Sequence, residues 1–74
     1  MNELDSVVIT VNLPEHNLKE GDVGTIVHVH DGGAAYIAEF ITYGGDTVAV
    51  VTLSREQVRP ALVTELPHVR AMAT

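Results

Sequence analysis

Short runs rich in β-branched residues recur along the chain and predict β-strands. The first run covers residues 6–11 (SVVITV), and similar runs follow at residues 25–30, 35–42 and 47–53. Residues 58–60 (VRP) are able to form one further short strand. The sequence therefore predicts four or five strands.

Glycine-rich segments separate these runs. Asp31-Gly32-Gly33 and Tyr43-Gly44-Gly45-Asp46 are predicted hairpin turns, because glycine adopts a positive φ without steric cost. Gly21 and Gly24 bracket a tight turn before the second strand. Pro14 ends the pairing of the first strand, because proline has no backbone N–H to donate. Most strands are thus expected to be joined by short, sharp connections.

Two segments between the strands have other expected structures. Residues 12–22 are mostly polar and predict an ordered loop, with Leu13 and Leu18 as its anchors in the core. Residues 54–57 (SREQ) have serine followed three residues later by glutamine, the pattern of a capping box, which predicts one short helical turn.

Several short strands with glycine turns within about sixty residues predict an all-β fold, a small barrel. The connections are too short for parallel crossovers, so the strands are expected to be antiparallel. A closed barrel would also leave no exposed sheet edges. We assign the barrel to residues 1–60. Residues 61–74 are expected to form a C-terminal appendage that packs on the barrel or on a partner.

The composition restricts the class of partner. Ten acidic residues against four basic ones give a formal net charge of −6, which opposes binding to nucleic acid or to an anionic membrane surface. The chain has no cysteine, so disulfides and thiolate metal sites are excluded. The acidic first six residues (MNELDS) lack the features of a signal peptide, and a cytoplasmic location is therefore expected.

His28 and His30 are candidate metal ligands. They lie two residues apart on a predicted strand, so both imidazoles can point to one face and bind zinc or a similar ion. A third ligand would be needed, and His16, Asp31 or Glu39 would have to supply it through the fold. The alternative is that the two histidines are polar positions that alternate with valines on a half-exposed strand.

No other group of residues has the pattern of a catalytic site. Glu15 and His16 are adjacent in the predicted loop, and adjacent side chains rarely converge on one substrate atom. Arg55 and Arg59 are expected to be solvated or paired with nearby acidic residues such as Asp22. We therefore expect a non-enzymatic protein without a cofactor.

Four motifs make the chain similar to a family of short bacterial proteins known as a domain of unknown function. They are Leu13-Pro14-Glu15-His16, Gly21-Asp22-x-Gly24-Thr25, Glu39-Phe40 and Gln57-x-Arg59-Pro60, within a resemblance that covers residues 4–60. The resemblance implies an SH3-like barrel. It implies no activity, because a fold by itself does not define a function.

The start of the second strand also resembles that of KOW-type SH3-like barrels, at Gly21-x-x-Gly24-Thr25-Ile26-Val27. In such a barrel Ile26 and Val29 would both be core residues, although they lie on opposite faces of a regular strand. A β-bulge near Val27 would reconcile the two positions and change the direction of the histidine side chains.

The third and fourth strands carry apolar residues on both faces. On the third strand, Tyr36, Ala38 and Phe40 alternate as the core face. The opposite face then carries two isoleucines, and the fourth strand has the same excess of apolar residues. Such a surface predicts contact with the C-terminal appendage or with another subunit. The expected interface residues are Ile37, Ile41, Ala49, Val51 and Leu53.

The sequence therefore favours a small module that acts by protein–protein association. It would either self-associate or dock to one protein partner, as an antitoxin, an immunity protein or an accessory subunit does. Metal or ligand binding through His28 and His30 is the alternative. Nucleic-acid binding is a third possibility, which the KOW resemblance suggests and the acidic charge opposes.

Overall fold

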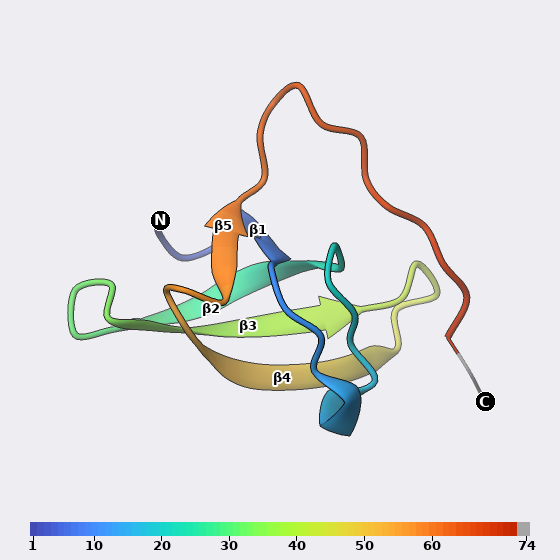
Figure 1. The fold of residues 1–74 in the computed structure, drawn as a ribbon, viewed down its shortest axis with the longest axis horizontal. Helices are drawn as coiled ribbons and strands as arrows, with labels where there is room; N and C mark the ends of the chain where they lie inside the picture. Colours follow the sequence, from blue (N-terminus) through green and yellow to red (C-terminus); the bar gives the residue numbers. More distant parts are fainter. Residues whose placement is uncertain (73–74) are drawn as a thin grey trace.

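The computed structural model describes residues 1–72, which form one antiparallel sheet and a long C-terminal segment (Figure 1). The sheet order is β4-β3-β2-β1-β5. The elements in chain order are β1 (Ser6–Ile9), the 3-10 helix η1 (Pro14–His16), β2 (Val23–His30), β3 (Ala35–Ile41), β4 (Thr47–Ser54) and β5 (Val58–Pro60).

The prediction of an all-β, antiparallel fold with about five strands is confirmed. Strands β2, β3 and β4 form a meander, and β5 returns to pair with β1 on the other side. The two predicted hairpin turns join these strands, and Asp31, Gly32, Gly33 and Gly45 all adopt positive φ there. Within residues 1–72 the edge strands β4 and β5 do not pair, so the expected closed barrel is instead an open sheet.

The sheet is nevertheless strongly curled, because a short turn joins its two edges. Four residue steps from Ser54 to Val58 span at most about 14 Å of extended chain. The edges of a flat five-stranded sheet would be about 19 Å apart, at the usual spacing between strands. The chain can therefore pass from β4 to β5 only if the sheet bends around its inner face.

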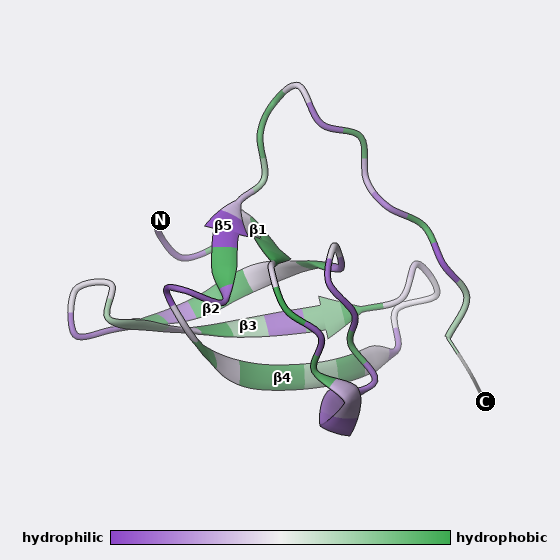
Figure 2. Ribbon diagram, viewed as in Figure 1, coloured by the Kyte–Doolittle hydropathy of each residue, from purple (hydrophilic) through white to green (hydrophobic). Residues whose placement is uncertain are grey.

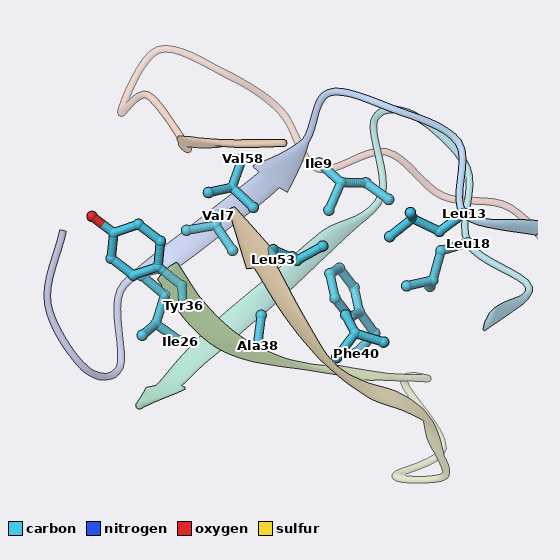
Figure 3. Close-up of a cluster of buried hydrophobic side chains, with 11 residues drawn as sticks. Val7, Ile9, Leu13, Leu18, Ile26, Tyr36, Ala38, Phe40, Leu53 and Val58 are labelled. Carbon is cyan, nitrogen blue, oxygen red and sulfur yellow. The ribbon is translucent and has the colours of Figure 1, made fainter. Parts of the chain in front are cut away.

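All five strands contribute side chains to one hydrophobic core on this inner face (Figure 3). Phe40 packs directly over the backbone of β2 at Gly24, where an added Cβ would lie 2.7 Å from the Phe40 ring. The predicted anchors Leu13 and Leu18 are both buried, and they pair with each other across η1. The cluster consists of Val7, Ile9, Leu13, Leu18, Ile26, Tyr36, Ala38, Phe40, Val51, Leu53 and Val58.

Short helical structure occurs in a different place from the one that the sequence predicts. The helical turn lies in the loop after β1, at η1, where Pro14 occupies the first turn. The segment after β4 is a turn, in which Gln57 N–H donates to the Ser54 carbonyl and Gln57 Oε1 accepts from Ser54 N–H. Part of the expected capping interaction is therefore formed. Because β4 ends at Ser54 and β5 begins at Val58, the segment between them is too short for the predicted helical turn.

The C-terminal segment from residue 61 to residue 72 contains no strand or helix; it leaves β5 in a wide arc and descends near the turn between β3 and β4 (Figure 1). The burial of Val8 indicates where this segment passes the sheet. This residue lies on the opposite face of β1 from Val7 and Ile9, yet it is buried, and it shares a small cleft with Leu66 and Pro67. We call residues 61–72 the tail. None of the described helices is long and apolar enough to cross a membrane.

Candidate functional site

The outer face of β3 and β4 carries exposed apolar side chains. Directly paired residues share a face, and Glu39 pairs with Val50 while Ile41 pairs with Thr47. Ile41 is 59% exposed and Val50 is 55% exposed, whereas Ile37 is half-buried. The expected exposure of Ile41 is therefore observed, and Val50 is a member of this face that the sequence analysis did not identify.

The other three residues of the expected interface lie on the inner face. Leu53 pairs with Tyr36, Val51 with Ala38, and Ala49 with Phe40, and these β3 residues all point into the core. Val51 and Leu53 are buried and Ala49 is half-buried, so their expected place on an outer surface is wrong.

A β-bulge causes this difference. The register shifts between Phe40 and Ile41, so that one extra residue, Val48, lies on β4. Without the shift, Phe40 would face Val48, and the alternate set of β4 residues would point inward. The polar Thr52, which lies on the outer face opposite Ile37, is the sequence signal that favoured the observed arrangement.

Strand β4 also presents an unprotected edge. All eight of its residues (TVAVVTLS) are uncharged, and most are apolar (Figure 2). It pairs only with β3 among the described strands. The opposite edge, β5, has three residues, of which one is Arg59 and one is Pro60. Charges, proline, short length and bulges hinder the addition of another strand, and of these features β4 has only the bulge at Val48.

The candidate metal ligands lie side by side on β2. The predicted bulge near Val27 is confirmed by a register shift between Ile26 and His28. The imidazole rings of His28 and His30 have centroids 4.5 Å apart and pack edge to face. Among residues 1–72, however, no three histidine or carboxylate side chains are grouped to hold a metal ion. The fold therefore does not bring a third ligand to the pair.

The sequence analysis missed a partly buried ion pair that joins the tail to the turn before β2. Asp22, in the turn before β2, is only 9% exposed. Arg70 donates from Nε to Asp22 Oδ1 at 2.8 Å and from Nη2 to Oδ2 at 2.5 Å, and Nη2 also donates to the Asn17 carbonyl. The two paired residues are 48 positions apart. No local pattern could indicate such a pair.

The environment of Asp22 stabilises its ionised form. Burial disfavours the charge, but the hydrogen bonds from Arg70 and from Lys19 N–H outweigh this effect and hold the pKa of Asp22 below its ordinary value. His68 lies near the same carboxylate, with Nε2 3.9 Å from Oδ1. Arg59, one of the arginines considered as a partner for Asp22, instead pairs with Glu65 at 2.7 Å.

A cleft of about 630 Å³ lies beside this ion pair. The sheet side of the cleft is largely apolar, and it includes Val23, Phe40, Ile41 and Val48. The tail segment from Pro67 to Met72 forms the other side. The cleft therefore combines an apolar surface with one buried carboxylate, which a guanidinium group already contacts.

These features define a small all-β protein with an open antiparallel sheet, an uncharged edge strand and an apolar cleft beside a carboxylate. A comparison with known families identifies it further. Residues 3–60 match the family described as Domain of unknown function (DUF4926), and the chain belongs to this family. The resemblance found over residues 4–60 is thereby confirmed as membership of a family of unknown function. No curated protein and no solved structure matches the chain.

Proposed function

We propose that this protein is a non-enzymatic, cytoplasmic association module that pairs with a second copy of itself through the β4 edge. The observation that carries the proposal is the combination of an eight-residue uncharged edge with the exposed Val50 and Ile41 beside it. Edges of this kind are templates for the addition of another strand. Main-chain hydrogen bonds would supply most of the affinity.

The charges next to β4 favour an antiparallel arrangement of the two copies. Asp46 precedes the strand and Arg55 follows it. In an antiparallel pair, the Asp46 end of one copy lies near the Arg55 end of the other, whereas a parallel pair would bring like charges together. The rest of the acidic chain disfavours contact between copies, so this uncharged edge is the favoured place for it.

The SH3-like nature of the sheet is part of this proposal. It is supported by the meander of β2, β3 and β4, by the return of β5 to β1, and by the bulge at Val27. In such a barrel the break between β4 and β5 leaves both strand edges available. Only β4 is long enough to accept a partner strand.

The solution mass of the protein tests the proposal. We expect the wild type to form a dimer at micromolar concentration, and we expect Val50→Lys to shift it to a folded monomer, because the change puts a charge beside the paired edge. Val63→Lys is the matched control, since Val63 is fully exposed in the tail and the change adds the same charge. A wild type that remains monomeric at several hundred micromolar in light scattering contradicts the proposal, and so does an equal effect of both variants.

A further inference from the structure

The turn that contains Asp22 itself helps to position the Asp22 carboxylate, in addition to the contacts from the tail. Lys19 N–H donates to Oδ2 at 2.8 Å, and Asp22 N–H donates to the Lys19 carbonyl. The Asp22 carbonyl accepts from Ile9 N–H on β1. The turn and the sheet therefore hold this carboxylate in place. A receptor group that is already oriented loses little conformational entropy when it binds a ligand.

The tail, in contrast, is attached to the sheet by few contacts. Among the described residues, its backbone connects to a strand through Ala61 N–H, which donates to the Ser6 carbonyl. The pair of Arg59 and Glu65 lies on the surface. After Glu65, the hydrogen bonds that hold the tail to Asn17 and Asp22 come from the Arg70 side chain. The large side chains of Leu66 and Val69 are mostly exposed.

The side of the site formed by the sheet lies within the part of the chain that defines the family. Asp22, Val23, Phe40, Ile41 and Val48 all lie within residues 3–60, which match the family, and the tail lies outside them. The family domain thus supplies an apolar cleft with an oriented carboxylate. The arginine that pairs with this carboxylate comes from an appended segment.

We propose that this cleft is a binding site for an extended peptide segment of a partner protein that carries an arginine next to apolar residues. In the isolated chain the tail holds the site closed with its own Arg70. The partner's arginine replaces Arg70 on Asp22, and its apolar neighbours pack on Val23, Ile41 and Val48. A basic segment suits this receptor, because the chain carries a net charge of −6.

The geometry selects arginine over lysine. Asp22 accepts from Arg70 through two different nitrogen atoms, Nε and Nη2, one on each carboxylate oxygen. The planar guanidinium makes such paired hydrogen bonds, whereas a lysine ammonium is a single point of charge. The cleft shares Ile41 and Val48 with the surface at β4. Recognition of the arginine takes place at Asp22, which lies outside β4, so the inference does not depend on self-association.

Binding of a labelled peptide to the Arg70→Ala variant tests this inference. The probe is a fluorescent peptide with the sequence of residues 66–72 (LPHVRAM). In fluorescence polarisation we expect saturable binding to Arg70→Ala and at least tenfold weaker binding to the wild type, because the attached tail competes at a high effective concentration. Val63→Ala, a change in the tail away from the site, is the control and should bind as weakly as the wild type.

Changes in the peptide separate recognition of arginine from non-specific attachment. Replacing its arginine by lysine should weaken binding to Arg70→Ala about tenfold or more, and replacing it by the neutral isostere citrulline should abolish binding. Neither change alters the protein, so the test holds even if an Asp22→Asn variant fails to fold. The inference is overturned if the peptide does not bind Arg70→Ala at up to millimolar concentration, or if all three peptides bind equally.

Discussion

At the scale of single residues, Asp22 and Gly24 lie two positions apart, and different physical effects restrict which side chain each position accepts. Gly24 is required by space, because the Phe40 ring occupies the volume that its side chain would need. Asp22 is required by charge, because it is the one charged side chain that the described fold buries. Both lie in the Gly21-Asp22-x-Gly24-Thr25 motif that supported the family resemblance. The structure thus provides a physical reason for each.

Gly24→Ala should destabilise the protein. The new Cβ would lie within 3 Å of three atoms of the Phe40 ring, so the ring or β2 must move. Overpacking of this kind costs about 1–3 kcal/mol, and we expect a lower melting temperature in circular dichroism. Gly44→Ala is the control, because it meets no atom closer than 3.7 Å and has no positive φ. It should be neutral or stabilise the protein. Equal melting temperatures for the two variants would contradict the steric argument.

The ion pair of Asp22 and Arg70 should stabilise the protein only above acidic pH. The pKa of Asp22 is lowered in the folded state. As the pH falls below about 4, Asp22 therefore takes up a proton in the unfolded chain before it does so in the folded protein. The stability that the ion pair contributes is lost between this pH and the pKa of Asp22 in the folded state. Arg70→Gln should lower the melting temperature at pH 7. The difference from the wild type should shrink towards pH 2.

Glu65 provides a comparison for this measurement. The hydrogen bond from Arg59 lowers the pKa of Glu65 to about 2, but this pair is exposed to solvent. Exposed pairs contribute little because water and salt screen them. Glu65→Gln should therefore change the melting temperature less than Arg70→Gln at pH 7. A constant effect of Arg70→Gln across the whole pH range would show that the arginine acts through packing and not through charge.

At the scale of elements, the sequence predicts strands and turns well but registers poorly. The five strand cores and both hairpin turns follow from local patterns of apolar residues and glycines, and the bulge at Val27 follows from the resemblance to KOW-type barrels. The second bulge, at Val48, does not, because β4 is largely apolar on both faces and the polar Thr52 is only a weak sign of which face points outward. A shift of one residue then moved Val51 and Leu53 from the expected surface into the core.

The candidate sites show the same limit. A contact between neighbours such as His28 and His30 is visible in their spacing, and the structure places their rings together. The contact between Asp22 and Arg70 depends on the path of a tail without regular structure, and no spacing rule predicts it. The sequence thus indicated the weaker chemical candidate, and the fold supplied the stronger one.

At the scale of the whole molecule, residues 1–72 combine a long open edge at β4 with a cleft whose carboxylate is already paired. The carboxylate of the cleft is paired with the chain's own arginine, whereas the outer edge of β4 has no partner strand within the described residues. Asp46 and Arg55, at the two ends of β4, form no ion pair with any described residue. Both charges are therefore free to contact a second copy.

An exchange of these two charges provides the sharpest test of the antiparallel pair. Asp46→Arg alone, or Arg55→Asp alone, replaces two symmetric attractive contacts with repulsive ones. At about 0.2–1 kcal/mol for each exposed pair, the loss of the two attractive contacts alone should weaken self-association by roughly 2- to 30-fold, and the new repulsion adds to this effect. The double variant Asp46→Arg/Arg55→Asp restores the complementary charges and should recover most of the wild-type affinity.

Sedimentation equilibrium at low ionic strength measures these dissociation constants under conditions in which surface charges are least screened. Recovery in the double variant requires that the two ends of β4 meet across the interface, because the double variant and the wild type have the same net charge. A parallel pair would gain nothing from the exchange. If the double variant associates as weakly as the single variants, or if the single variants associate like the wild type, the antiparallel β4 pair is wrong.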